Sequence, residues 1–258
     1  MQFLICSQGE GIPDGAVSLL EERGIGIELQ GYGLKGVRSL EAWRERLETH
    51  RRFRDRFQGL TVMHGPFIGV NYCHDDHYFR RAVRRRLDRT FEAVRTLRAH
   101  RLVLHSGLST DVGKFGITDD WIRLTADFWR DEIRRYEEIG VTVVLENIVD
   151  DSPDFLRIVH DRVDHPNLKI CLDTGHVNVW SSRDLDDWLT GLGSRIHHIH
   201  LHNNDGTADQ HRRPDDGTLD ITAFLQRVRK EIPHAWISLE AMAGIEEQIE
   251  ILEHLICA

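Results

Sequence analysis

The amino-acid sequence predicts an α/β fold, a single (β/α)8 TIM barrel that spans residues 1–258 as one domain. Strand-like and helix-like segments alternate along the whole chain, eight of each, without a linker or a change in composition. Strict alternation of this kind implies a parallel sheet with helices outside it. The strand-like segments are short aliphatic runs, as expected for parallel strands that are buried on both faces. The length of 258 residues suits one barrel better than two small domains.

The positions of the elements follow from hydrophobic periodicity and from cap residues. The strands are expected at residues 3–7, 26–29, 60–64, 102–105, 142–147, 169–173, 197–202 and 236–240. The helices are expected near residues 14–23, 39–56, 76–99, 119–139, 153–160, 184–192, 221–230 and 245–256. Ser39, Thr118 and the pair Ser152-Pro153 are typical of helix N-caps or first helical turns.

Six of the expected strands end in a side chain that binds metal ions. These side chains are His64, His105, Glu146, Asp173, His200 and Glu240. Since side chains alternate along a strand, all six are expected to point into the barrel, together with the residues two positions deeper: Val62, Val103, Val144, Cys171, His198 and Ser238. The carboxyl ends of the strands meet at one end of a barrel, which is where barrel enzymes carry their catalytic groups.

Three further candidate ligands lie in the connections after strands. His176 follows Asp173 by three residues, and Asp209 and His211 are two residues apart, so an extended loop directs both to the same side. The nine candidates offer imidazole nitrogen and carboxylate oxygen, which Zn and Mn sites accept. Nine ligands exceed the need of one ion but suffice for two or three ions that share carboxylates. Core histidines, structural ion pairs and, for Asp209, a plain turn residue are the alternatives.

These residues stand in sequence motifs that resemble a known family. The motifs are Val-Leu-Glu146-Asn147, Cys-Leu-Asp173-Thr-Gly-His176, His200-Leu-His202-Asn-Asn-Asp205-Gly206, Asp209-Gln-His211 followed by Pro214-Asp-Asp-Gly217, and Ser-Leu-Glu240. Together they resemble the xylose isomerase-like TIM-barrel superfamily (AP endonuclease family 2), and within it the endonuclease IV-like branch. The resemblance covers nearly the whole chain.

The resemblance implies a site for three zinc ions. In that branch His64 and His105 would bind one ion that Glu146 bridges to a second; Glu146, Asp173, His200 and Glu240 would bind the central ion; His176, Asp209 and His211 would bind the third. This set implies metal-assisted hydrolysis of a phosphoester in a small molecule or nucleotide-like compound. Glu146 and Glu240 would be the catalytic carboxylates, Glu146 as the bridge and Glu240 positioning the nucleophile.

The same superfamily also contains sugar or sugar-phosphate isomerases and epimerases, which are the alternative. Those enzymes hold one Mn, Mg or Co ion with a Glu, Asp, His, Glu set, here Glu146, Asp173, His200 and Glu240. The two glutamates then shuttle a proton. The ketose 3-epimerase branch adds a glutamate and an arginine at positions that Ser152 and Gly206 occupy here, which weakens that specific interpretation. A binding module that keeps its metals for structure is a third class.

Three residues are weaker candidates for substrate binding. Glu28 ends the second expected strand and either binds substrate or only satisfies loop amides. Lys114, in the connection after the fourth strand, either reaches a phosphate or belongs to ordinary loop structure. His202 has the same parity as His200 and is its rival as a ligand.

The overall charge and hydropathy limit the partners. A net charge of -9 argues against a nucleic-acid surface, so DNA is not an expected partner. The arginines of residues 80–86 fall in a helix of the outer ring and are expected to form a solvated face. The N-terminus lacks the features of a signal peptide, and no apolar stretch reaches the ~20 residues that span a bilayer. We therefore expect a cytoplasmic enzyme with a small-molecule substrate, no membrane contact and a possible homo-oligomeric state.

Overall fold

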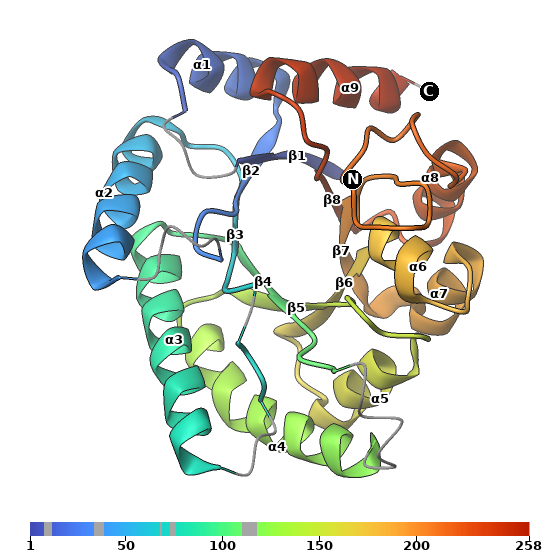
Figure 1. The fold of residues 1–258 in the computed structure, drawn as a ribbon. Helices are drawn as coiled ribbons and strands as arrows, with labels where there is room; N and C mark the ends of the chain where they lie inside the picture. The colour runs from blue at the N-terminus through green and yellow to red at the C-terminus, as the bar shows by residue number, and fades with distance from the viewer. Residues whose placement is uncertain (8–11, 34–38, 68, 73–75, 110–117, 258) are drawn as a thin grey trace.

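Eight parallel strands form a closed barrel in chain order (Figure 1). The computed structural model describes residues 1–7, 12–33, 39–67, 69–72, 76–109 and 118–257. The strands are β1 (Gln2–Ser7), β2 (Gly26–Leu29), β3 (Thr61–His64), β4 (Arg101–His105), β5 (Thr142–Glu146), β6 (Leu168–Asp173), β7 (Ile196–Leu201) and β8 (Trp236–Leu239). β1 pairs with both β2 and β8, which closes the barrel. The predicted (β/α)8 barrel is confirmed.

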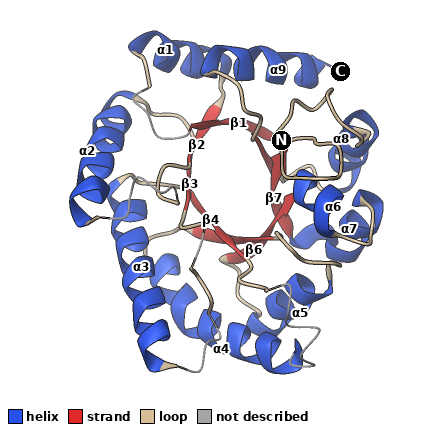
Figure 2. Cartoon of the chain, in the orientation of Figure 1, coloured by secondary structure: helices blue, strands red, loops and turns tan. Residues whose placement is uncertain are grey.

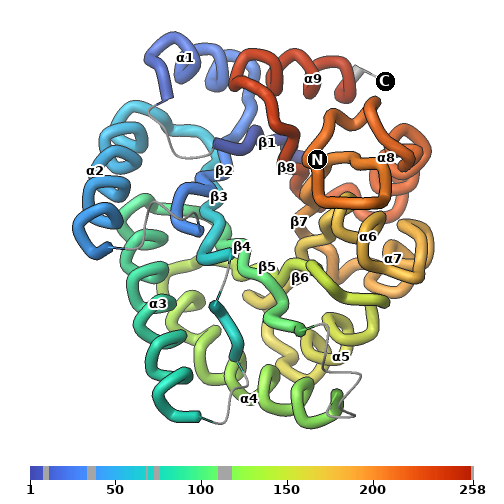
Figure 3. Tube along the Cα trace, in the orientation of Figure 1, coloured from blue at the N-terminus to red at the C-terminus, as the bar shows by residue number. Residues whose placement is uncertain are grey.

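The helices form a ring outside the strands (Figure 2). In the part of the chain that the structure describes they are α1 (Asp14–Arg23), α2 (Leu40–Arg56), α3 (His77–Thr96), α4 (Thr118–Glu137), α5 (Asp154–Val163), α6 (Thr174–Trp180), α7 (Leu185–Leu192), α8 (Ile221–Glu231) and α9 (Ile245–Cys257). The chain passes once around the barrel, so that α9 comes to lie beside α1 (Figure 3). None of the described helices is long and apolar enough to cross a membrane.

Helix α6 was not expected from the sequence. It begins directly at the end of β6, where the carboxylate of Asp173 accepts a hydrogen bond from the backbone N–H of His176 at 2.6 Å. This is N-cap geometry, and it satisfies one of the free N–H groups of the first turn. The helix is seven residues long and contains a glycine and two valines, so it carries little intrinsic helical signal. Its effect is to place His176 one turn above the end of the strand.

The barrel interior and the space between barrel and helices are packed separately. Inside the barrel, Leu4, Val62, Val103, Val144 and Cys171 form a small buried cluster. The larger core lies outside, where the opposite faces of the strands pack against the helices. The inward direction predicted for Val62, Val103, Val144 and Cys171 is therefore confirmed. The ligand candidates lie two residues further along the same strands.

The pairing between β6 and β7 contains one irregularity that matters for the site. Ile170 pairs with Ile196, but the next residue, Cys171, pairs with His198, so His197 is skipped. Asp173 is thereby brought opposite His200. Between β4 and β5, His105 pairs with Glu146 without any shift in register. The register thus sets candidate ligands side by side on adjacent strands.

Candidate metal centre

The predicted ligands converge at the carboxyl ends of the strands. His64, His105, Glu146, Asp173 and His200 are the last or next-to-last residues of their strands, and Glu240 directly follows β8. The side chains of His64, Glu146, Asp173 and His200 are fully buried, whereas Asp209 and His211 are about one quarter exposed, at 25% and 24%. The centre is therefore closed toward the barrel and open toward its mouth.

The first cluster joins His64, His105 and Glu146. Nε2 of His64 lies 2.9 Å from Oε2 of Glu146, and Nε2 of His105 lies 3.6 Å from the same oxygen. Burial lowers the pKa of His105 to about 4, despite the nearby carboxylate. A neutral imidazole is the form that binds a metal ion. This cluster therefore has the composition of a His-His-carboxylate zinc site.

The central cluster places three carboxylates around one imidazole nitrogen. Nδ1 of His200 lies 3.0 Å from Glu146 Oε1, 3.0 Å from Glu240 Oε2 and 3.7 Å from Asp173 Oδ2. Oε2 of Glu240 is buried, and its contact with Nδ1 of His200 lacks hydrogen-bond geometry. Buried carboxylates are retained only when they are paired or bind metals. One imidazole is a poor counter-charge for three acids, and all four side chains are close enough to hold a single ion, so the donor set fits a divalent cation.

The third cluster joins His176, Asp209 and His211. Oδ2 of Asp209 lies 3.3 Å from Nε2 of His176 and 3.0 Å from Nε2 of His211. Burial alone would lower the pKa of His176, but Asp173 and Asp209 raise it to about 10. His211 adopts a φ of 49°, a left-handed conformation that only a few per cent of non-glycine residues adopt. Without an ion these imidazoles act as cations beside Asp209, a role that a bound metal ion would take over.

Three of the candidate imidazoles are oriented by backbone carbonyl groups. In each of them Nδ1 lies within hydrogen-bond distance of a carbonyl oxygen: His64 with Gly65 (3.0 Å), His176 with Asn147 (2.7 Å) and His211 with Glu240 (2.9 Å). A carbonyl oxygen only accepts, so Nδ1 is the donor and Nε2 is the nitrogen that faces the cluster. Ligating histidines are commonly held in this way. The histidines are thus oriented for metal binding before an ion arrives.

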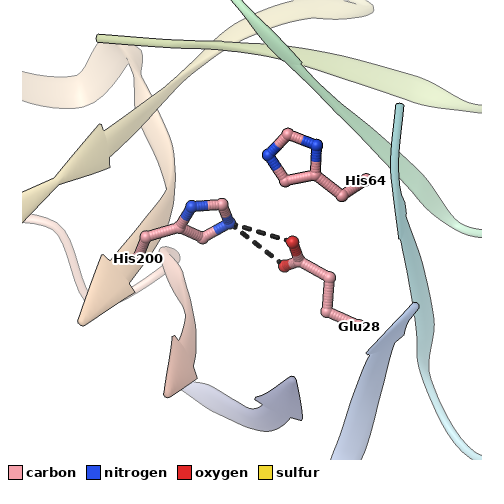
Figure 4. Close-up of side chains that lie close together, drawn as sticks. All are labelled: Glu28, His64 and His200. Atoms are coloured by element: carbon pink, nitrogen blue, oxygen red, sulfur yellow. Dashed lines mark hydrogen bonds and ion pairs between the residues drawn. The ribbon is translucent and has the colours of Figure 1, made fainter. Parts of the chain in front are cut away.

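Two of the three weaker candidates, Glu28 and His202, lie in the described part of the chain. Glu28 is fully buried inside the barrel. Its carboxylate faces the imidazole of His200 (Figure 4). Side chains of the barrel interior contact both of its oxygens, and its role toward a substrate stays a prediction. Lys114 lies outside the described residues.

His202 is buried between the central and third clusters. Its Nε2 lies 3.1 and 3.2 Å from the two oxygens of Asp173, and its ring is parallel to that of His211 with centroids 4.2 Å apart. A side chain at Gly175 would fill this space, because a Cβ there would lie 1.9 Å from the imidazole of His202. The glycine of the Asp-Thr-Gly-His motif is the sequence signal for this close approach. His202 is thus placed to orient Asp173.

Comparison with known proteins places the chain in a family. A family model described as "Xylose isomerase-like TIM barrel" matches residues 26–255. The chain belongs to this family. The superfamily predicted from the motifs is therefore confirmed, and it is a superfamily of enzymes. Among curated proteins the chain resembles an uncharacterized protein of Methanocaldococcus jannaschii, 23% identical over 201 residues, which are 72% of this chain but only 66% of that protein's length.

Several solved structures share the fold over nearly the whole chain. The TTHB071 protein from Thermus thermophilus, studied after soaking with ZnCl2, is 25% identical, with a TM-score of 0.80 over 99% of this chain and 98% of that chain. A D-tagatose 3-epimerase-like protein is 21% identical, with a TM-score of 0.77 over 99% and 97%. The IOLI protein, which carries a zinc atom, is 15% identical, with a TM-score of 0.73 over 99% and 96%.

Proposed function

We propose that this protein is a hydrolase of phosphoesters in small or nucleotide-like molecules, and that it works with two or three zinc ions. The observation that supports this proposal most strongly is the position of Glu146. Its Oε2 faces Nε2 of His64 at 2.9 Å and Nε2 of His105 at 3.6 Å, while its Oε1 faces Nδ1 of His200 at 3.0 Å. A carboxylate with ligand-type nitrogens on both oxygens is suited to bridging two ions.

The same position makes Glu146 a poor proton shuttle. A one-metal isomerase needs a carboxylate oxygen that is free to take a proton from the substrate. Neither oxygen of Glu146 is free here, and its side chain is only 1% exposed. Burial alone would raise the pKa of Glu146, but His200 and His105 lower it well below its usual range. A carboxylate with a low pKa stays ionised, so it is available to a cation and accepts protons poorly.

The remaining residues fit the steps of a hydrolysis. Bound divalent ions would lower the pKa of water toward ~7 and neutralise the oxygens of the phosphate group. Glu240 contributes the other glutamate of the central cluster, and its Oε2, 3.0 Å from Nδ1 of His200, would accept the proton of the attacking water once that nitrogen is held by the ion. Gln30 donates a hydrogen bond to the other oxygen of Glu240 and thereby orients it. Asp209 and His211 are the more exposed ligands, so the phosphate would approach from their side.

A one-metal sugar isomerase or epimerase is the second candidate. Similar structures whose activity is described are a D-tagatose 3-epimerase-like protein, a D-psicose 3-epimerase and an L-ribulose 3-epimerase, and these descriptions favour the second candidate over the first. At sequence identities of 21%, 15% and 14%, these similarities show a shared fold and do not show a shared activity. Gly206 has a φ of 79°, a conformation in which the arginine of the ketose 3-epimerases would be strained.

Replacing both Asp209 and His211 with asparagine separates the two candidates. The hydrolase proposal expects the double variant to lose about one zinc per chain and most of its activity on bis(p-nitrophenyl) phosphate, by a factor on the order of 10² or more. A one-metal isomerase would keep its metal content and its turnover of a panel of ketoses. Asp215→Asn combined with His254→Asn is the matched control, because both residues are exposed and lie outside the three clusters. An unchanged hydrolysis rate in the Asp209/His211 variant would refute the proposed mechanism.

A further inference from the structure

A polar network lies beneath the central cluster, inside the barrel. Its members are Glu28 of β2, His198 and His200 of β7 and Ser238 of β8. All four side chains are fully buried, with exposed fractions of 0%. His198 and Ser238 were expected from the sequence to face inward, but without an assigned partner. Four polar side chains in the interior of a barrel require mutual hydrogen bonds to offset their desolvation.

Glu28 accepts a hydrogen bond from each of the other three members of this network. Nε2 of His200 lies 3.0 and 3.2 Å from the two carboxylate oxygens, which Figure 4 shows facing the imidazole. The hydroxyl of Ser238 donates to Oε2 at 2.7 Å, and Nε2 of His198 lies 3.1 Å from the same oxygen. Nε2 of His198 also lies 2.8 Å from the hydroxyl oxygen of Ser238. Since an ionised carboxylate only accepts, Nε2 carries the hydrogen in both imidazoles.

His200 is oriented through the opposite ring nitrogen from the other oriented histidines. In His64, His176 and His211 the nitrogen that donates to the backbone is Nδ1, and Nε2 faces the metal cluster. In His200 the donor is Nε2, and Nδ1 faces the carboxylates of the central cluster. No backbone carbonyl is within hydrogen-bond distance of a ring nitrogen of His200 among the described contacts. On the side of the ring that faces away from the metal cluster, Glu28 is therefore the group that orients His200.

We propose that Glu28 is a positioning residue that holds His200 in the tautomer and orientation in which Nδ1 binds the central metal ion. Ser238 and His198 in turn hold the carboxylate of Glu28 in place. A carboxylate behind a ligating histidine fixes the ring and makes the coordinating nitrogen more basic, and loss of such a partner typically lowers metal affinity 10- to 100-fold. This inference rests on the metal centre of the proposed function but not on the reaction that the centre performs.

Glu28 would have a different role if it bound a metal directly. Glu28, His64 and His200 are close enough to share an ion (Figure 4). However, the contact of Nε2 of His200 with both oxygens of Glu28 occupies the only nitrogen of that ring that faces Glu28. Nε2 of His64 is directed to Glu146. Both imidazoles are thus committed elsewhere, and Glu28 acts through His200.

The test measures zinc affinity and does not depend on a substrate. Glu28→Gln keeps the size of the side chain and removes its charge, and Ser238→Ala removes one hydrogen bond to Glu28 without touching His200. Both are made in a His64→Ala, His176→Ala background, which keeps the four central ligands and removes one ligand from each neighbouring cluster. The dissociation constant for Zn²⁺ is measured by competition with a chromophoric chelator. Leu4→Val, a change in the same barrel interior away from the network, is the matched control.

We expect Glu28→Gln to weaken the central ion 10- to 100-fold, Ser238→Ala to weaken it by less than tenfold, and Leu4→Val to leave it within twofold. Ring ¹⁵N chemical shifts of His200 in the zinc-loaded protein give a second readout: Nδ1 has the shift of a metal-bound nitrogen in the parent, and this signal weakens in Glu28→Gln at the same zinc concentration. A merely structural role of Glu28 would leave the shift and intensity of this signal unchanged.

Four results would overturn the inference. An affinity within twofold of the parent in folded Glu28→Gln refutes it while leaving the proposed function intact. Loss of a whole zinc ion per chain from full-ligand Glu28→Gln, with unchanged affinity for the remaining ions, would make Glu28 a ligand. A parent protein that binds no zinc at the central ligands would refute both the inference and the proposed function. If Glu28→Gln does not fold, an unchanged affinity in Ser238→Ala refutes the inference on its own.

Discussion

The two halves of the barrel interior are built differently just below the metal centre. Under the ligands of β3 to β6 the inward residues are Val62, Val103, Val144 and Cys171, which pack together in one hydrophobic cluster. Under the ligands of β7 and β8 the inward residues are His198 and Ser238, which bind Glu28. The first half supports its ligands by packing, and the second supports them by hydrogen bonds.

This difference corresponds to how the histidines above are oriented. His64, above the apolar half, gains its hydrogen bond from the backbone at the mouth of the barrel. His200, above the polar half, gains its hydrogen bond from below, through Glu28. A ligand held by the backbone needs nothing from the barrel interior, so that interior can remain apolar. A ligand held from below requires buried polar groups, whose desolvation is offset only if each has a partner.

The largest expected effect on the free energy of unfolding comes from the metal ions, which would supply positive charge to the carboxylates of both halves. An ion present at about 1,000 times its dissociation constant stabilises the folded state by about 4 kcal/mol, so two ions would contribute about 8 kcal/mol. We expect a strong chelator to lower the urea midpoint of unfolding accordingly. Glu146→Ala, which removes the shared ligand, should lose at least half of this zinc-dependent stabilisation. Equal midpoints with and without chelator would show that neither half depends on a metal ion.

The next largest effect comes from making the apolar half polar. Val103 is fully buried in the small interior cluster. Val103→Asn removes apolar packing and introduces an amide without a partner, so the free energy of unfolding should fall by about 3–5 kcal/mol. Val103→Ala is the control that separates the two causes, with an expected loss of about 2 kcal/mol. Equal losses in the two variants would mean that this half also accommodates polar groups, and the contrast between the halves would fail.

The apolar half was the part of the interior that sequence could predict. Alternation along a strand is a local signal, and it correctly directed Val62, Val103, Val144 and Cys171 inward. The position of a side chain at the end of an aliphatic run is equally local, so the strand-end ligands could be named from the order of the residues alone. Their grouping into three clusters came from family resemblance, and the structure places the members of each group within a few ångströms of one another.

The polar half could not be predicted in the same way. Glu28 and His200 are 172 residues apart and lie on strands that do not pair with each other. Their contact depends on the diameter of the barrel and the tilt of its strands, which no short stretch of sequence encodes. The skip of His197 in the pairing of β6 with β7 is a second non-local feature. Helix α6 was missed because its main determinant is the side chain of Asp173, which was interpreted only as a ligand.

The smallest of the expected effects is a pH dependence of the polar half. Burial lowers the pKa of His198 to about 4, below its ordinary value of about 6.5. Between these values the unfolded chain binds more protons than the folded protein, so this residue makes folding less favourable as the pH falls from 6.5 to 4. The loss amounts to about 3 kcal/mol at the acidic end. His198→Gln cannot titrate and should lack this component.

The measurement is the free energy of urea unfolding of the parent protein and of His198→Gln, from pH 7 to pH 4, with chelator present in both. Other titrating groups are common to the two proteins, so the difference between the two curves reports the titration of His198. The parent should lose stability relative to His198→Gln as the pH falls. His254→Gln, an exposed change on α9, should give a curve parallel to the parent. If the His198→Gln curve were parallel as well, His198 would not be a buried neutral partner of Ser238, and the hydrogen-bonded support beneath His200 would need a different donor.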